Sequence, residues 1–156
     1  RSLDPIDICQ LPVPAGIRIV LAKPSYEMST KRGRTALPKS LPRATAMHQA
    51  AQVAAMVAGA CRNDLALFGR AIDDRIAEPA RAPLLPGFSE AKAAALRAGA
   101  VGCSISGSGP TLFAIAADDA TAERVGRAVT RAYRRAGFDT SLRVTAPDRR
   151  GARILR

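Results

Sequence analysis

The sequence predicts an α+β fold, a two-layer, ferredoxin-like sandwich in which helices cover one face of a four-stranded, mostly antiparallel sheet. Strand-like and helix-like segments follow in the order strand, helices, strand, strand, helix, strand, and a split βαβ sandwich is the simplest closure of that order. The chain has 156 residues, enough for one domain with its own core. Hydrophobic residues make up 47%, and 32 residues are Ala, so the core needs closely packed helices.

The first predicted strand covers residues 17–22 (IRIVLA), which are rich in β-branched side chains and lie between turn-forming Pro and Gly residues. A helix is expected next at residues 29–37, where the Ser-Thr pair at its start supplies an N-cap and Pro38 ends it. Apolar residues at helical spacing then predict a longer helix at residues 43–61.

A third helix is expected at residues 63–74, because Asn63 can cap its start. Residues 78–88 (EPARAPLLPGF) contain three prolines, which exclude a regular helix and predict a rigid, ordered loop. An Ala-rich helix then covers residues 88–98, and Gly99 ends it.

The last third of the chain is predicted to contain two strands, a helix and another strand, at residues 101–106, 111–116, 119–136 and 138–145. Gly107-Ser108-Gly109-Pro110 joins the first two strands by a tight connection. Residues 152–155 are a candidate for one more short strand.

The chain is strongly basic, with 24 Lys and Arg against 13 Asp and Glu and a net charge of +11. Many arginines lie opposite the apolar stripe of the predicted helix at residues 119–136, and we interpret them as a solvated face. A docking face for an acidic protein or a nucleotide phosphate is the alternative. Because zinc-finger spacing and aromatic RNA-reading strands are missing from the sequence, we expect no nucleic-acid partner.

The remaining composition argues for a cytoplasmic protein. The sequence has no run of about 18 apolar residues and no signal peptide, so we expect no membrane partner. Cys9, Cys61 and Cys103 are odd in number and widely spaced, which predicts reduced, mostly buried thiols. No His, Cys and carboxylate cluster has metal-ligand spacing, so we expect no metal site, and the lone His48 is expected to be structural.

The strongest local signal is the Gly-rich run ISGSGPT at residues 105–111. Glycines let backbone N–H groups converge in a nest that can hold phosphate oxygens, and serines add hydroxyl donors. Ser106, Gly107, Ser108 and Gly109 are therefore candidate phosphate-site residues. Because a strand follows the run, it is neither a Walker A loop nor a dinucleotide fingerprint. A purely structural hairpin is the alternative.

Two arginines and a threonine are candidate substrate-binding residues. Thr30 and Arg34 lie four residues apart on one predicted helical face, and Arg81 lies in the Pro-rich segment. Arginine offers a planar, always-charged, bidentate partner for a carboxylate or a phosphate. The alternative is an ordinary ion pair, for which the acidic candidates are Asp73, Asp74 and Glu78.

Three motifs carry a resemblance to a known family: STKRGR at residues 29–34, EPARAPLLPGF at residues 78–88 and ISGSGPT at residues 105–111. Over residues 24–113 the sequence resembles the GHMP family of small-molecule kinases, and within it the members that phosphorylate the side-chain hydroxyl of L-homoserine on the way to threonine. The resemblance implies L-homoserine and ATP as partners and Mg²⁺ as a cofactor.

The resemblance also implies roles for the candidate residues. Arg34 and Arg81 match positions that hold the amino-acid carboxylate, Thr30 matches a position lining the substrate pocket, and residues 106–109 match the loop at the phosphate site. Half of an isoprenoid-precursor kinase of the same family is one alternative. A non-catalytic module that binds an amino acid is another.

One departure from the family is large. The ATP-phosphate loop of the form PxxxGLGSSA and the Mg²⁺-binding carboxylate are missing from these 156 residues. We therefore interpret residues 1–156 as the C-terminal domain of such a kinase, without its N-terminal ATP-binding domain, and expect it to be inactive alone. Apolar surface at the vacant interdomain face and the family's common dimers predict a homodimer.

Overall fold

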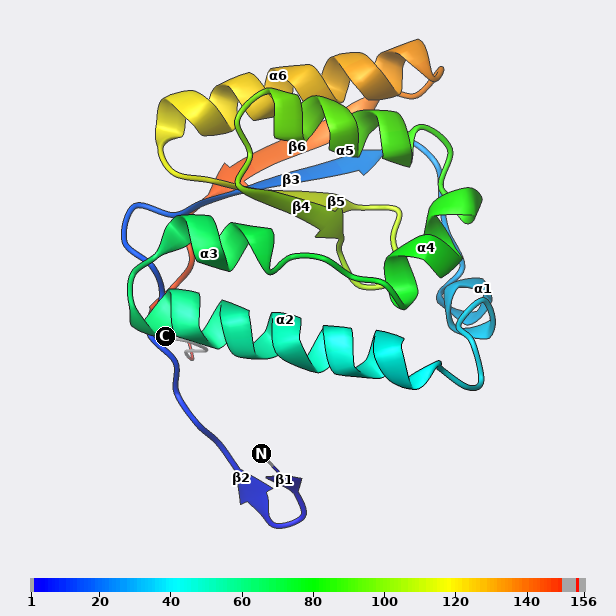
Figure 1. Cartoon of the computed structure of the whole chain (residues 1–156). Helices are drawn as coiled ribbons and strands as arrows, with labels where there is room; N and C mark the ends of the chain where they lie inside the picture. Colours follow the sequence, from blue (N-terminus) through cyan, green and yellow to red (C-terminus); the bar gives the residue numbers. More distant parts are fainter. Residues whose placement is uncertain (1, 150–153, 155–156) are drawn as a thin grey trace.

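The computed structural model describes residues 2–149 and 154, and its body is a four-stranded sheet (Figure 1). The strands are β3 (Arg18–Pro24), β4 (Gly102–Ile105), β5 (Leu112–Ala116) and β6 (Thr140–Thr145). They lie in the order β4-β5-β3-β6, and every neighbouring pair is antiparallel. This is the predicted ferredoxin-like α+β sandwich, so the fold class is confirmed.

Helices surround this sheet and connect its strands. They are α1 (Thr30–Thr35), α2 (Arg43–Cys61), α3 (Leu65–Arg70), α4 (Ala77–Arg81), the 3-10 helix η1 (Ala82–Leu84), α5 (Phe88–Arg97) and α6 (Asp119–Arg135). Helices α5 and α6 lie side by side over one face of the sheet (Figure 1). Small side chains of α5 allow this close packing, and Phe88, Leu112 and Tyr133 fill the core between the layers.

The opposite face of the sheet is covered at its β4 end by α3, on which α2 packs (Figure 1). A Cβ added to Gly69 of α3 would lie 2.5 Å from the carbonyl carbon of Val101 and closer still to its oxygen. Only a glycine allows α3 to approach the strand so closely. The prediction that helices cover one face of the sheet therefore holds for α5 and α6, while α2 and α3 form an additional layer on the other face.

The prediction of a rigid, ordered loop without regular helix at residues 78–88 is wrong, because α4 and η1 occupy most of this segment. The carboxylate of Asp74 accepts hydrogen bonds from the backbone N–H groups of Ile76 and Ala77, both at 2.8 Å, and of Glu78 at 3.2 Å. Pro79 lies within the first turn of α4, where backbone N–H groups have no intrahelical partner and proline is tolerated.

Helix α3 also differs from its prediction, since it begins later and ends earlier. Asp64 is its N-cap and accepts a hydrogen bond from the Leu67 N–H at 2.8 Å. Asn63 instead has a φ of +54° and accepts a hydrogen bond from the Ala15 N–H. Of the two residues predicted as N-cap of α1, Ser29 holds that position, although its side chain makes no capping hydrogen bond.

The N-terminal segment forms a two-strand hairpin that the sequence did not predict, β1 (Ser2–Leu3) with β2 (Ile6–Asp7), and it projects from the body (Figure 1). The candidate strand at residues 152–155 lies outside the described residues, apart from residue 154. Among the helices of the described part, none is long and apolar enough to cross a membrane.

The cysteines are free, as expected, but the prediction that most are buried is wrong. Cys103 is buried in β4, whereas Cys9 and Cys61 are exposed. Cys61 is the last residue of α2, a helix with apolar side chains on its outer face as well: Met47 is 64% exposed and Val53 is 58% exposed. Apolar character therefore does not predict burial along α2.

Candidate functional site

Arg81 joins two segments that lie far apart in the sequence. Its Nε donates a hydrogen bond to the Gly33 carbonyl in α1 at 3.0 Å, and its Nη1 donates one to the Gly107 carbonyl in the Gly-rich loop at 2.8 Å. These contacts span 48 and 26 residues of sequence. The structure therefore brings α1, the end of α4 and the Gly-rich loop together at one place.

The Gly-rich loop has the backbone conformation that its glycines allow. Gly107 has a φ of +61° and Gly109 a φ of +87°, and the peptide bond from Gly109 to Pro110 is cis. The Ser106 N–H donates to the Thr111 carbonyl at 2.8 Å, and the Gly109 N–H donates to the Ser106 carbonyl at 3.1 Å. Among the described residues, no protein acceptor takes the N–H groups of Gly107 and Ser108. These two amides are the backbone donors that the loop can offer to an anion.

Helix α1 packs directly against this loop. A Cβ added to Gly33 would lie 3.0 Å from the Ser108 Cβ, which is tighter than ordinary van der Waals contact, so glycine favours the close approach. Arg34 follows Gly33 in the chain, and Thr30 lies one helical turn earlier; both are exposed. In the described part of the chain, no carboxylate pairs with Arg34.

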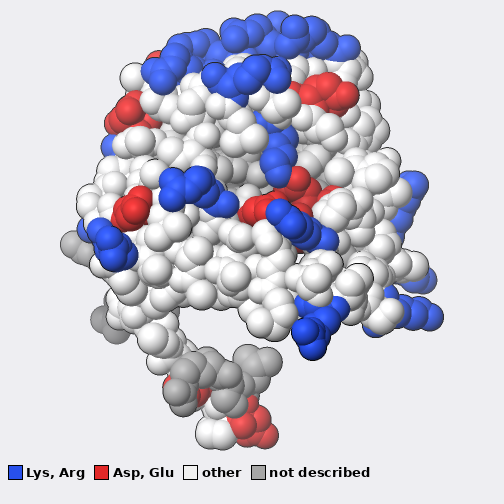
Figure 2. Space-filling model, viewed as in Figure 1, with Lys and Arg blue, Asp and Glu red and all other residues white. Residues whose placement is uncertain are grey.

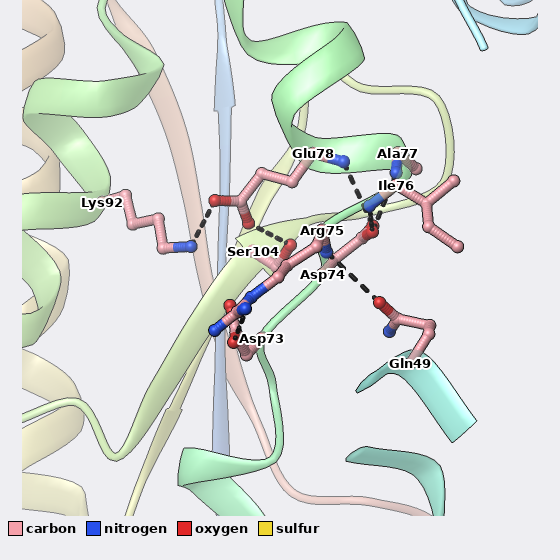
Figure 3. Close-up of polar contacts among 9 residues, drawn as sticks. All are labelled: Gln49, Asp73, Asp74, Arg75, Ile76, Ala77, Glu78, Lys92 and Ser104. Carbon is pink, nitrogen blue, oxygen red and sulfur yellow. Dashed lines mark hydrogen bonds and ion pairs between the residues drawn. The ribbon is translucent and has the colours of Figure 1, made fainter. Parts of the chain in front are cut away.

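The three carboxylates considered as partners of Arg81 are all engaged elsewhere (Figure 3). Asp74 caps α4, Asp73 contacts His48 Nε2 at 2.9 Å, and Glu78 binds Lys92 and Ser104. The alternative of an ordinary ion pair between Arg81 and one of these three carboxylates is therefore not what the structure shows. Because Arg81 binds only neutral carbonyls, its positive charge is uncompensated by the residues described and is available to an anionic ligand.

His48 has the structural role that the sequence suggested. It connects α2 to Asp73 in the segment after α3, and its side chain is 20% exposed. Among the described residues, no group of three or more His, Cys, Asp or Glu side chains could hold a metal ion.

Glu78, Lys92 and Ser104 form a polar cluster that was not predicted from the sequence (Figure 3). The Ser104 hydroxyl donates to Glu78 Oε2 at 2.6 Å, and Lys92 Nζ pairs with Glu78 Oε1. The side chains of Glu78 and Lys92 are 15% and 23% exposed. Glu78 lies within a segment of prolines and apolar residues, and a carboxylate in such a setting needs a partner. This pattern could have predicted from the sequence that Glu78 is paired.

The surface also carries a groove and a basic face. A groove of about 610 Å³ lies beside α4 and α5, but its lining includes none of the candidate site residues. Lys and Arg side chains gather over the part of the molecule where Figure 1 places α6 (Figure 2). The arginines of α6 are exposed while Val125 and Val129 are buried, which confirms the predicted basic outer face.

Comparison with known proteins identifies the family. The family model described as GHMP kinases C terminal matches residues 56–135. The chain belongs to the GHMP kinase family. The predicted resemblance is therefore confirmed, and the matched residues of this GHMP kinase domain extend from the middle of α2 to the end of α6.

Curated relatives of this GHMP kinase domain are named homoserine kinase. That of Chlorobaculum tepidum is 45% identical over 157 residues, which cover 99% of this chain and 48% of the relative. That of Arabidopsis thaliana is 37% identical and is covered to 43% of its length. The chain thus spans about half the length of the curated relatives it matches, and it corresponds to their C-terminal half.

Solved structures agree with this assignment. The crystal structure of homoserine kinase from Cytophaga hutchinsonii has 42% sequence identity and a TM-score of 0.91, and the match covers 94% of this chain and 46% of that one. A mevalonate kinase from L. major has a TM-score of 0.63 at 12% identity, over 88% of this chain and 44% of that one. The second similarity shows the fold alone.

Proposed function

We propose that the chain is the C-terminal domain of a homoserine kinase, a cytoplasmic enzyme that transfers the terminal phosphoryl group of ATP to the side-chain hydroxyl of L-homoserine in threonine biosynthesis. The observation that supports this proposal most directly is the pair of hydrogen bonds from Arg81 to the carbonyls of Gly33 and Gly107. They place a guanidinium without a counter-ion among the described residues between α1 and the Gly-rich loop. The relatives named homoserine kinase support the same substrate.

In this proposal Arg34 and Arg81 bind the homoserine carboxylate, and Thr30 lines the pocket. Arg81 uses only Nε and Nη1 for the two carbonyls, so Nη2 keeps both of its N–H groups for a carboxylate. The free N–H groups of Gly107 and Ser108 suit the oxygens of a phosphoryl group. These residues would contribute by positioning and by neutralising charge, which dominate the catalysis of phosphoryl transfer.

ATP and Mg²⁺ are the expected cofactors of the whole enzyme. The uncompensated arginines and open amides described above fit an anionic phosphoryl group, whereas the described residues offer no cluster of metal ligands. When bound, ATP supplies the phosphoryl group and Mg²⁺ balances its charge. Within the proposal, the metal ligands and the ATP-phosphate loop belong to an N-terminal domain outside these 156 residues, and the 156-residue chain alone does not consume ATP.

Self-association is part of the same proposal. The outer face of α2 carries exposed apolar side chains, including Met47 at 64% and Val53 at 58% exposure. Exposed apolar side chains are typical of protein interfaces when they form a contiguous patch. We expect the protein to form a homodimer.

The test is isothermal titration of L-homoserine into the purified chain, with and without Mg-ATP, beside a coupled assay of ATP consumption. We expect weak binding whose dissociation constant rises at least tenfold on Arg34→Gln or Arg81→Lys, with no ATP consumption. Arg131→Gln changes an exposed arginine of α6 and is the matched control. Equal binding by the wild type and both site variants would contradict the carboxylate assignment, and homoserine-dependent ATP consumption would contradict the incomplete site.

The alternative within the family is half of an isoprenoid-precursor kinase. Its support is weaker, because the solved mevalonate and phosphomevalonate kinases are only 10–13% identical to this chain. Mevalonate titrated in parallel distinguishes the two. Binding of mevalonate in place of homoserine would favour the alternative.

A further inference from the structure

Helix α4 is attached at two places to the segment that forms the Gly-rich loop. Near the start of α4, Glu78 accepts a hydrogen bond from the hydroxyl of Ser104 in β4, at 2.6 Å. At the end of α4, Arg81 donates to the carbonyl of Gly107 in the loop, at 2.8 Å. The helix therefore holds both the strand that leads into the loop and the loop itself.

The first attachment is nearly buried and is balanced in charge. Ser104 is 5% exposed, and the Glu78 side chain is 15% exposed. A carboxylate so removed from water needs a counter-ion and hydrogen-bond donors. Lys92 of α5 supplies the counter-ion and Ser104 supplies the donor, as Figure 3 shows. Glu78 thus connects α4 to α5 and to β4 at one point.

The orientation of α4 depends on such attachments, because the helix has only five residues. Helices this short have little stability of their own, and tertiary contacts decide where they lie. If Glu78 loses its partners, α4 is free to shift. The Arg81 guanidinium would then leave the carbonyls of Gly33 and Gly107, and α1 would separate from the loop.

We propose that Glu78 is a positioning residue: with Lys92 and Ser104 it fixes α4 so that Arg81 can join α1 to the Gly-rich loop. In this proposal Glu78 acts through Arg81 and is not itself a ligand of the substrate. That this arrangement shapes a homoserine site rests on the proposed function, whereas the coupling between Glu78 and Arg81 does not.

The coupling is tested by amide hydrogen exchange on the 156-residue chain without any substrate. The reporters are the hydrogen-bonded N–H groups of Ser106 and Gly109 in the loop, measured relative to core amides of α6. We expect Glu78→Gln and Arg81→Lys each to raise the exchange rate of the loop amides at least threefold. Because Glu78 acts through Arg81, the exchange rate in the double variant should be less than twice that of the faster single variant. Unchanged loop exchange in Glu78→Gln, or effects that multiply in the double variant, would overturn the proposal.

Two further variants keep the result interpretable. Glu123→Gln removes an exposed ion pair with Arg127 on α6, at 3.4 Å, and should leave loop exchange unchanged. Ser104→Ala removes only the hydroxyl that binds Glu78, and it replaces Glu78→Gln as the test if that variant does not fold. We expect Ser104→Ala to raise loop exchange as well. Unchanged loop exchange in Ser104→Ala would overturn the proposal.

Homoserine titration of the same variants separates this inference from the proposed function. We expect Glu78→Gln to raise the dissociation constant at least threefold, as a consequence of displacing Arg81. Coupled exchange without any homoserine binding would contradict the proposed function and leave the positioning role intact. Homoserine binding by the wild type, together with loop exchange that Glu78→Gln leaves unchanged, would contradict the positioning role and leave the proposed function intact.

Discussion

Gly69 of α3 lies against β4, and replacing it with alanine should destabilise the domain strongly. The added Cβ would lie 2.5 Å from the carbonyl carbon of Val101 and 2.7 Å from its Cβ. Contact with backbone cannot be relieved by rotating a side chain. On the facing strand, a Cβ added to Gly102 would lie 2.6 Å from the Gly69 carbonyl oxygen, so the backbones of α3 and β4 are in close contact at both glycines.

The expected cost follows from two opposing effects. Overpacking typically costs about 1–3 kcal/mol and occasionally more, and a backbone neighbour places this site at the upper end. Alanine recovers up to about 1 kcal/mol of helix propensity relative to glycine. We expect Gly69→Ala to lower the free energy of unfolding by about 2–3 kcal/mol, which corresponds to a fall in Tm of roughly 4–12 °C for a domain of this size.

Gly126→Ala is the matched control for this prediction. Gly126 also lies within a helix, but its added Cβ would meet the tip of the Leu142 side chain at 2.8 Å, and Leu142 is 41% exposed and can move. We expect this variant to unfold within about 1 kcal/mol of the wild type. Urea and thermal unfolding followed by circular dichroism measure both. Equal destabilisation by the two substitutions would refute the argument from the α3–β4 contact.

Three further predictions concern single side chains. The Tyr133 hydroxyl is buried without a partner among the described residues, so Tyr133→Phe should raise the unfolding free energy by up to about 1 kcal/mol in urea titrations; a loss above 1 kcal/mol would contradict this. The hydrogen bond from the Thr121 N–H holds the pKa of Asp118 below its usual value. The resulting stabilisation is therefore present above about pH 4 and is lost as pH falls through the lower native pKa. The unfolding free energy of Asp118→Asn should fall less steeply with acid than that of the wild type, and equal slopes in parallel acid titrations would contradict this. Burial raises the pKa of Cys103 to about 12, so Ellman's reagent should modify the two exposed thiols at once and Cys103 only after unfolding, and three fast thiols in the native chain would contradict its burial.

The fold was predictable because segments with the hydrophobic periodicity of a helix or a strand are separated along the chain by turn-forming residues. The error at residues 78–88 arose from treating proline as a helix breaker without regard to position. Pro79 falls in a first turn, and Asp74 supplies the cap from four residues before Glu78. The exposure of Cys61 was hidden because α2 is apolar on nearly every face, so its buried side cannot be read from the sequence.

The candidate site was predictable in its residue types but not in its contacts. The Gly-rich loop and Arg81 could be singled out from motif and chemistry. The partners of Arg81 could not, because they are backbone carbonyls of Gly33 and Gly107, which carry no side-chain signal. The Glu78 cluster was missed for a related reason: Lys92 and Ser104 come from other elements, and only the folded sheet brings them to α4.

We propose that this chain forms the homoserine-binding half of a kinase. The most direct measurement is ADP formation by a chimaera in which the first half of the Chlorobaculum tepidum homoserine kinase, 45% identical over the shared half, precedes this chain. We predict homoserine-dependent ADP formation that Arg34→Gln reduces at least tenfold. A folded chimaera that binds ATP but forms no more ADP with homoserine than without it would contradict the account.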